Sequence, residues 1–254
     1  MRPAQPTSPG PTDGAAAVAS DCWVLLHGTP LSPAVWDGVS AHLSPRGRVL
    51  CPPVAPAGDA RDVAAELAAW LASADSGLPG QMHLVGHSFG GQVALDLALL
   101  APGRVRTLTL ICTRDTPFPG FAAAAAALRR GDAVDPEAAL GRWFTGAELK
   151  DGGPVVRYAR SRIEQADRPS WAAALEAIAH YDRSRRVQAI RAPVTLLAAE
   201  LDQVSTPDAM AALAGRLPQG SLTVLAGAAH MSPFTDPAAL AELIIRTRPE
   251  GDMQ

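Results

Sequence analysis

A serine in a glycine-rich turn is the residue of this chain best suited to nucleophilic chemistry. Residues 82–92 begin as an apolar strand, continue as Gly-His-Ser-Phe-Gly over residues 86–90, and end as the start of a helix. In such a G-x-S-x-G turn the serine sits at a sharp bend, and the two glycines let the strand and the helix approach each other. An ordinary turn with a capping serine is the alternative. The strand–turn–helix context favours Ser88 as a nucleophile whose hydroxyl projects above a sheet.

A serine hydroxyl attacks a carbonyl well only when a base takes its proton, and histidine is the candidate base here. His230 follows the last apolar run of the chain, in a loop that can reach over the carboxyl edge of a sheet, where Ser88 is also expected. His83 lies within an expected strand, and His42 and His180 lie on helical patterns, so these three are expected to pack or to face solvent. We therefore predict that His230 is the base.

An acidic side chain should hold this histidine in the right tautomer and stabilise its charged form. Asp202 follows the apolar run at residues 194–198, and His230 follows the next apolar run, at residues 222–226. This gives the chain order serine, acid, histidine that is expected of this kind of site. Glu200, two residues earlier, and Asp115, after another apolar run, are rival carboxylates. Order and placement favour Asp202.

The negative oxygen that forms when a serine attacks a carbonyl needs two hydrogen-bond donors. One is the amide of Phe89, which follows the nucleophile at the start of a helix. The other should come from the loop after the first apolar run, where Gly28 and Thr29 carry amides and Pro30 carries none. We predict that the second donor is the amide of Thr29.

Side chains next to these groups are expected to line the substrate pocket. They are His27, in the loop that carries Thr29, His87, inside the serine turn, and Met231, beside the predicted base. We expect His27 to shape its loop rather than to act as a base. The chemistry requires neither a metal nor an organic cofactor.

Short apolar runs alternate with helical patterns, which predicts an α/β fold with a mostly parallel sheet of about six strands flanked by helices. The expected strands are residues 22–27, 48–51, 82–86, 105–112, 194–198 and 222–226. The expected helices are residues 34–43, 62–74, 91–100, 207–217 and 237–246. Two of these helices open with a capping residue followed by proline, at Thr206 and Asp236, which is a strong start signal.

The alternation is interrupted once, between the strands expected at 105–112 and 194–198. Residues 117–187 contain helical patterns broken by glycine and proline but no convincing strand, and a helical stretch of this length is a cap rather than a loop. The predicted organisation is a flexible leader of residues 1–20, a core of residues 21–116 and 188–248, a helical cap of residues 117–187 inserted between the last core strands, and a tail of residues 249–254.

The composition excludes several classes of protein. Of 254 residues, 48% are hydrophobic and 19% are charged, which suits a buried core and argues against wholesale disorder. The net charge of −3 gives no support for binding nucleic acid. No apolar run is long enough for a signal peptide or a bilayer span, so we expect a cytoplasmic protein without a membrane partner. The sequence leaves the oligomeric state open, and a monomer or homodimer is the expectation. The cysteines form no CxxC pair or metal-ligand pattern, and Cys51 and Cys112 are expected to be buried, reduced thiols.

Taken together, these segments resemble the α/β-hydrolase fold family over nearly all of residues 21–246. The resemblance rests on Leu-His-Gly-Thr-Pro at residues 26–30 with Trp36 downstream, on residues 86–91, on Asp202 with the Thr-Pro helix start after it, and on Gly-Ala-Ala-His at residues 227–230. It implies a cap inserted after the sixth strand of the family's sheet. The family usually begins with an antiparallel strand pair, but only the leader precedes Cys22. We therefore expect six core strands with at most one irregular addition from residues 14–20.

The cap resembles that of the 3-oxoadipate enol-lactonases, which are cofactor-free hydrolases that open a small acidic enol-lactone. The likeness lies in Gly-Arg-Trp-Phe-Thr at residues 141–145, in residues 172–182 and in Ile-Arg-Ala-Pro at residues 190–193. In that group the tryptophan lies in the cap near the substrate pocket, so the resemblance implies the same place for Trp143; a core aromatic residue is the alternative. The first loop looks more like that of general esterases and perhydrolases of the same fold.

The expected function is a cofactor-independent serine hydrolase of a small ester or lactone, with Ser88, His230 and Asp202 as a triad and an acyl-enzyme as the intermediate. The fold alone does not determine the reaction. One alternative is a non-hydrolytic or biosynthetic enzyme on the same scaffold, such as a perhydrolase, a C–C hydrolase, a lyase or a cyclase. The other is a non-catalytic ligand-binding module, against which the complete triad argues. The expected partner is a small-molecule substrate.

Overall fold

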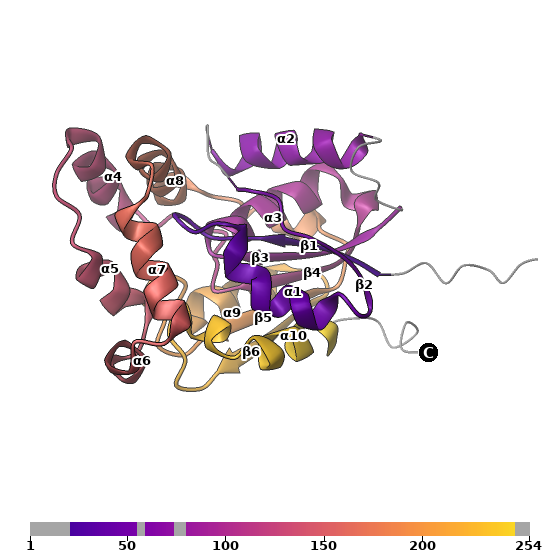
Figure 1. The fold of residues 1–254 in the computed structure, drawn as a ribbon. Coiled ribbons are helices and arrows are strands. Elements are labelled where there is room, and N and C mark those ends of the chain that lie inside the picture. The colour runs from indigo at the N-terminus through magenta and orange to yellow at the C-terminus, as the bar shows by residue number, and fades with distance from the viewer. Residues whose placement is uncertain (1–20, 55–58, 74–79, 247–254) are drawn as a thin grey trace, which may run out of the picture.

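Six parallel strands form one sheet in the order β2-β1-β3-β4-β5-β6 (Figure 1). The computed structural model describes residues 21–54, 59–73 and 80–246. The strands are β1 (Asp21–Leu26), β2 (Gly47–Leu50), β3 (Met82–His87), β4 (Val105–Ile111), β5 (Val194–Ala199) and β6 (Gly220–Leu225). Each predicted strand is present, with its bounds shifted by two residues or fewer. The predicted leader, with any strand from residues 14–20, and the predicted tail lie outside the described residues.

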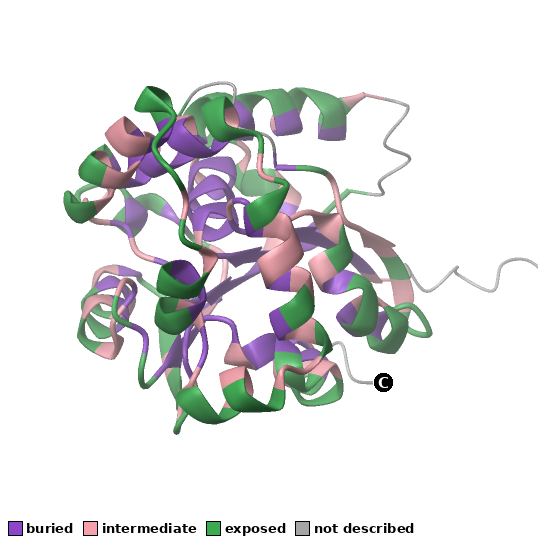
Figure 2. Ribbon diagram, turned by 60° about the vertical axis from the view of Figure 1, so that its left-hand side comes forward, coloured by how far each residue is buried: buried purple, intermediate pink, exposed green. Residues whose placement is uncertain are grey.

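Helices cover both faces of the sheet, which explains why its central strands are apolar throughout. Helices α2 (Ala60–Ala72) and α3 (Phe89–Leu100) lie above the sheet, and α1 (Asp37–Leu43) and α10 (Pro237–Arg246) lie below it (Figure 1). Helix α9 (Pro207–Arg216) packs on β5 and β6. Buried residues concentrate in the central strands and in α3, while the outer helices expose one side (Figure 2).

Five helices lie between β4 and β5, where the sequence predicts a cap. They are α4 (Gly120–Arg130), α5 (Pro136–Trp143), α6 (Gly146–Asp151), α7 (Pro154–Glu164) and α8 (Arg168–His180). We call these helices the cap; they gather at one end of the sheet, at the left of Figure 1. Residues 117–187 are all described, and they contain no strand. Short 3-10 helices complete the fold at η1 (Pro33–Trp36), η3 (Pro102–Arg104), η4 (Val187–Ala189) and η5 (Ser232–Thr235).

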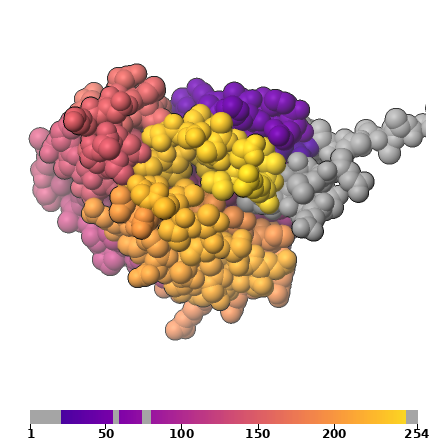
Figure 3. Space-filling view, turned by 90° about the horizontal axis from the view of Figure 1, so that it is seen from below, coloured from indigo at the N-terminus to yellow at the C-terminus, as the bar shows by residue number. Residues whose placement is uncertain are grey.

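Capping residues set where the helices begin. Thr206 and Asp236 each accept a hydrogen bond from the amide three residues further on, at 3.3 and 2.9 Å, so α9 and α10 start where the sequence predicts. Helix α2 starts two residues earlier than expected because Asp59 and Asp62 form a reciprocal capping box. On the underside of the molecule, the C-terminal helix α10 lies against α1, which closes that face of the sheet (Figure 3).

The three cysteines are unpaired thiols. Cys22 and Cys112 are buried, whereas Cys51 is only half-buried, because β2 is the edge strand and the chain leaves the sheet at this residue. The expectation that Cys51 is buried is therefore wrong. None of the helices in the described part of the chain is long and apolar enough to cross a bilayer.

The turn between β3 and α3 depends on glycines that allow a very close approach of backbones. A Cβ atom on Gly90 would lie 2.3 Å from the carbonyl oxygen of Leu26 in β1. A Cβ atom on Gly86 would lie 2.5 Å from the carbonyl oxygen of Gly90. Both distances are far shorter than van der Waals contact, so the strand, the turn and the helix can meet here only if both residues are glycine.

We expect Gly90→Ala to lower the free energy of unfolding by about 3 kcal/mol or more, because the added carbon would collide with backbone that cannot move freely. Gly141→Ala is the matched control, since no atom of the described part of the chain lies within 4 Å of a Cβ at that position in α5. Replacing this glycine within a helix should raise stability by about 0.5–1 kcal/mol. Urea unfolding followed by circular dichroism measures the free energy of unfolding of both variants. Similar changes in Gly90→Ala and Gly141→Ala would contradict the close contact at Gly90.

Candidate active site

Ser88 occupies the bend between β3 and α3 in a backbone conformation that non-glycine residues rarely adopt. Its φ is 53° and its ψ is −122°. Two hydrogen bonds to neighbouring residues hold this conformation. The Ser88 amide donates to the Ile111 carbonyl at 3.0 Å, and the Ser88 carbonyl accepts from the Thr113 side-chain hydroxyl at 2.7 Å. The Ser88 side chain makes no capping bond to α3. The hydroxyl therefore faces the pocket instead of being used in the fold.

The loops after β5 and β6 bring an acid and a histidine together. Nδ1 of His230 donates to Oδ2 of Asp202 at 2.6 Å, and both side chains are buried. The other carboxylate oxygen, Oδ1, accepts from the amides of Val204 and Ser205 at 2.8 and 3.0 Å. Burial raises the pKa of Asp202, but the charge and hydrogen bond of His230 and the two amide bonds outweigh it, so the pKa lies below its ordinary value.

The two rival carboxylates are engaged elsewhere. Asp115 is fully buried and accepts two hydrogen bonds from Arg216, at 2.9 and 2.6 Å. Glu200 is exposed and accepts from the amide of Gly227 at 2.6 Å. Of the three candidate carboxylates, Asp202 is the one that contacts His230.

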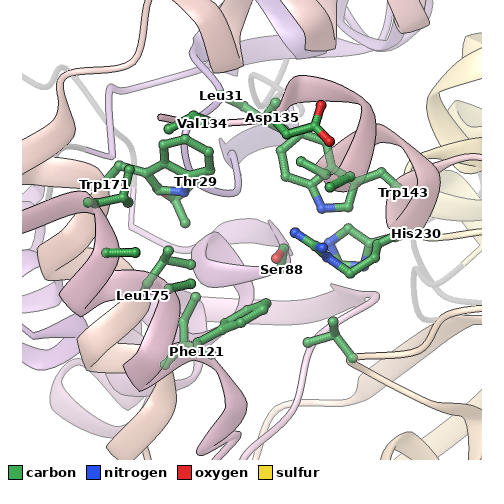
Figure 4. Close-up of a pocket in the computed structure, with 18 of the residues that line it drawn as sticks. Thr29, Leu31, Ser88, Phe121, Val134, Asp135, Trp143, Trp171, Leu175 and His230 are labelled. Carbon is green, nitrogen blue, oxygen red and sulfur yellow. The ribbon is translucent and has the colours of Figure 1, made fainter. Parts of the chain in front are cut away.

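A pocket of about 220 Å³ lies between the cap and the carboxyl edge of the sheet. Ser88, Thr29 and His230 line it from the core, and His87, Met231 and Trp143 also line it, as the sequence predicts. Figure 4 shows Ser88 beside His230, with Trp143 above the histidine. The structure thus brings together residues as distant in the chain as Thr29 and Met231, which are 202 positions apart.

The cap supplies apolar pocket walls that the sequence interpretation missed. Helix α4 contributes Phe121 and Leu128, and α8 contributes Trp171, Leu175 and Ile178. Figure 4 shows Phe121, Trp171 and Leu175 of this set. The side chains from α8 are spaced by four and three residues, which places them on one face of the helix. This periodicity was a signal for an inward apolar face. Asp132, Asp135 and Arg142 bring charged groups to the same lining.

Two backbone amides are placed to act as donors near Ser88. The loop after β1 lies against the serine turn, because a Cβ atom on Gly28 would be 2.9 Å from the Cβ of Ser88. Thr29 follows in this loop and lines the pocket, and Phe89 begins α3. Within the described ranges, neither the Thr29 amide nor the Phe89 amide has a recorded protein acceptor. Both amides are therefore available to a negative oxygen on a ligand.

His27 supports this loop from below. Its Nδ1 donates to the Gly28 carbonyl at 2.9 Å, and its Nε2 accepts from the Val54 amide at 3.0 Å. Burial lowers the pKa of His27 to about 4, although the bond to Gly28 acts in the opposite direction. His27 does not line the pocket, so the prediction that it is a pocket residue is wrong. Both ring nitrogens are occupied by backbone groups, which turns the ring away from the cavity.

His87 supports the loop of the predicted base. Its Nε2 donates to the carbonyl of His230 at 3.2 Å, the two rings lie 4.8 Å apart, and Phe234 packs edge-on against it. Burial and then the charge of His230 lower the pKa of His87 to about 3. Its Nδ1 is buried and has no hydrogen-bond partner among the residues that the structure describes. His87 is therefore a neutral ring in the wall of the site.

His87, Cys112 and His230 bring three potential metal-ligand atoms within 4.8 Å of one another. The bonds of Nδ1 of His230 to Asp202 and of Nε2 of His87 to a carbonyl each engage one nitrogen of a ring, as is usual for metal-binding histidines. The third group does not suit a metal ion. Burial and the charge of Asp202 raise the pKa of the Cys112 thiol well above its ordinary value, which disfavours the thiolate that metals bind.

Comparison with known proteins agrees with this geometry. The family model described as "Alpha/beta hydrolase family" matches residues 23–243. The chain is 32% identical over 244 residues to a pimeloyl-[acyl-carrier protein] methyl ester esterase of Aromatoleum aromaticum, covering 88% of this chain and 97% of the relative. It is 30% identical over 227 residues to the protein of that name from Nitrosomonas europaea, covering 83% of this chain and 88% of the relative.

Among solved structures, the enol-lactonase from Burkholderia xenovorans superimposes with a TM-score of 0.82 at 21% identity. The match covers 90% of this chain and 91% of the enol-lactonase. At this identity the likeness concerns the fold. The coverage is too large for the core alone, so it extends into the cap.

The low pKa of His27 predicts a stability that falls in acid. Its pKa is about 4 in the folded protein and 6.5 as a reference, so between pH 7 and 4.5 the unfolded chain binds a proton that the folded protein does not. Stability therefore decreases as the pH falls through this range. From pH 7 to 4.5, the free energy of unfolding of the wild type should fall by about 2 kcal/mol more than that of His27→Gln.

Urea unfolding at a series of pH values measures this difference. His42→Gln is the control, because His42 is exposed on α1, and its profile should follow that of the wild type. Parallel profiles for His27→Gln and the wild type would show that His27 is not held neutral by burial.

Proposed function

This chain belongs to the alpha/beta hydrolase family and is a hydrolase acting on ester bonds, and from that premise we propose that it is a cofactor-independent serine esterase. The proposed triad is Ser88, His230 and Asp202, and the proposed oxyanion donors are the amides of Thr29 and Phe89. The single observation that carries the proposal is the 2.6 Å contact between His230 and Asp202 in the pocket that also contains Ser88.

In the proposed acylation step, the Ser88 oxygen attacks the ester carbonyl. Nδ1 of His230 donates to Asp202, so Nε2 is the nitrogen that takes the serine proton. The carbonyl oxygen becomes negative and accepts hydrogen bonds from the amides of Thr29 and Phe89. When this intermediate collapses, His230 gives its proton to the leaving alcohol and the acyl group stays on Ser88.

In the proposed deacylation step, water takes the place of the alcohol. His230 removes a proton from the water, whose oxygen attacks the acyl carbonyl, and the same two amides hold the second oxyanion. Collapse returns the proton to Ser88 and releases the acid. Asp202 stays ionised throughout, because its hydrogen bonds and the charge of His230 keep its pKa low.

The substrate class we propose is a methyl ester of an acyl chain. The two relatives named as methyl ester esterases share 32% and 30% identity with this chain, and this favours an open-chain ester over a lactone. The apolar walls from α4 and α8 suit an acyl chain. A lactone remains the second candidate, because Trp143 of the lactonase-like segment lines the pocket.

Ser88→Ala should lower kcat/KM for p-nitrophenyl acetate by about 10⁴-fold or more and abolish labelling by a fluorophosphonate. Asp202→Asn should lower it by about 10⁴-fold, because the amide stabilises the wrong histidine tautomer. The matched control is Glu200→Gln, which removes the charge of the neighbouring rival acid and should leave the rate unchanged. An active Ser88→Ala protein, or equal effects at residues 200 and 202, would reject the triad.

A substrate panel separates the two candidate classes. We expect straight-chain methyl esters, free or attached to an acyl carrier protein, to be turned over faster than enol-lactones. Each methylene that the pocket buries should add about 0.8 kcal/mol, or about fourfold in kcat/KM, until the pocket is full. Leu175→Trp should shorten the preferred chain without slowing an acetate ester. Faster turnover of an enol-lactone than of every methyl ester would favour the second candidate.

A further inference from the structure

The cap is hydrogen-bonded to the loop that carries Thr29. The hydroxyl of Tyr158, on α7, accepts from the amide of Ser32 at 2.9 Å and lies 3.0 Å from its hydroxyl, and it donates to the Ser32 carbonyl at 3.1 Å. If the Ser32 hydroxyl donates, these bonds use the single proton and both lone pairs of the phenol. Ser32 lies three residues after Thr29, so a side chain of the cap fixes the end of the loop that supplies one proposed oxyanion donor.

The cap is also hydrogen-bonded to the loop that carries His230. Oε2 of Glu148, on α6, accepts from the hydroxyl of Ser232 at 3.0 Å, and that hydroxyl accepts from the amide of Ala229 at 2.8 Å. On the other side of the histidine, the amide of Met231 donates to the carbonyl of Trp143 at 2.8 Å. The backbone groups before and after His230 are therefore both tied to the cap.

These bonds lie in a part of the interface between cap and core that is not closely packed. A groove of about 650 Å³ separates α6 and α7 from η1, α1 and η5. Tyr158, Glu148, Val35 and Phe234 are among the residues that line it. Because apolar packing is incomplete along this groove, the hydrogen bonds of Tyr158 and Glu148 provide specific connections across it.

We propose that the cap holds the catalytic loops in place, with Tyr158 as a positioning residue for the oxyanion donor and Glu148 as a positioning residue for His230. The inference rests on the proposed function, because it assigns a role to residues that support the same triad. Neither side chain touches the reacting atoms; each acts through a loop. Displacement of a catalytic group by about 1 Å can cost on the order of 10²-fold in rate, so the loss of such a bond should reduce kcat.

The test for Tyr158 compares two tyrosine hydroxyls that both join the cap region to the core. Tyr158→Phe removes the bonds to Ser32. Tyr181→Phe removes a bond of 3.0 Å to the carbonyl of Gln92 in α3, which belongs to neither of the two loops. With p-nitrophenyl acetate we expect Tyr158→Phe to lower kcat by about 10- to 100-fold with KM changed less than threefold. Tyr181→Phe should keep kcat within twofold.

Binding of a trifluoromethyl ketone provides a readout that a loss of stability would not move. This inhibitor adds to Ser88 as an oxyanion, so its inhibition constant should rise in Tyr158→Phe by about the same factor as kcat falls. All assays are run well below the midpoint of thermal unfolding of each variant. If Tyr158→Phe does not fold, Ser32→Ala removes one of the bonds and should lower kcat by a smaller factor.

The test for Glu148 uses rescue by an uncharged acceptor. Glu148→Ala removes the acceptor for Ser232 and should lower kcat by about tenfold or more, whereas Glu148→Gln keeps an oxygen at that position and should recover most of the rate. The effects of Tyr158→Phe and Glu148→Ala should multiply in the double variant, because they act on different loops.

The outcomes separate this inference from the proposed function. A wild-type protein that neither hydrolyses esters nor reacts with a fluorophosphonate would overturn the proposed function and the inference with it. An active wild type whose Tyr158→Phe and Glu148→Ala variants keep kcat within twofold would overturn the inference alone. Equal losses in Tyr158→Phe and Tyr181→Phe would also overturn it, because the effect would then be a general one of cap attachment.

Discussion

The close approach of three backbone segments around Ser88 is the constraint on which the rest of the structure depends. The end of β3, the start of α3 and the loop after β1 meet where no Cβ atom fits on Gly86 or Gly90. This contact holds Ser88 in its unusual conformation and sets the Thr29 loop beside it. Since β1 and β3 are neighbours in the sheet, the geometry of the proposed oxyanion hole follows directly from the order of the strands.

Burial and hydrogen bonding give different roles to three histidines that all follow or end strands of the sheet. His27, His87 and His230 all lie within the core side of the site, yet only His230 has a carboxylate beside it. Desolvation keeps the other two rings neutral. The nitrogens of His27 bond to backbone groups of Gly28 and Val54, and Nε2 of His87 bonds to the carbonyl of His230. On the core side, the site therefore places its carboxylate beside the histidine proposed to exchange a proton and sets neutral rings around that pair. The cap contributes the apolar walls and the charged groups of Asp132, Asp135 and Arg142.

The sequence predicted features that depend on local pattern, and it missed those that depend on distant contacts. Strands and helix starts could be found because apolar runs and capping residues act within a few positions, and the order of Ser88, Asp202 and His230 followed from where loops leave parallel strands. The orientation of His27 could not be predicted, because it is set by the amide of Val54, 27 positions away. The bonds between Tyr158 and Ser32 span 126 positions. No periodicity in either segment indicates that pairing.

The order of the strands also has a consequence for the chain as it is synthesised. After β3 has formed beside β1, strands β4, β5 and β6 join the same edge of the sheet in the order in which a ribosome would make them. Each new strand can thus pair with one that is already complete. Ser88 emerges first, the cap follows, and the two residues proposed to activate the serine emerge last. A nascent chain therefore carries an unassisted alcohol until His230 has left the exit tunnel.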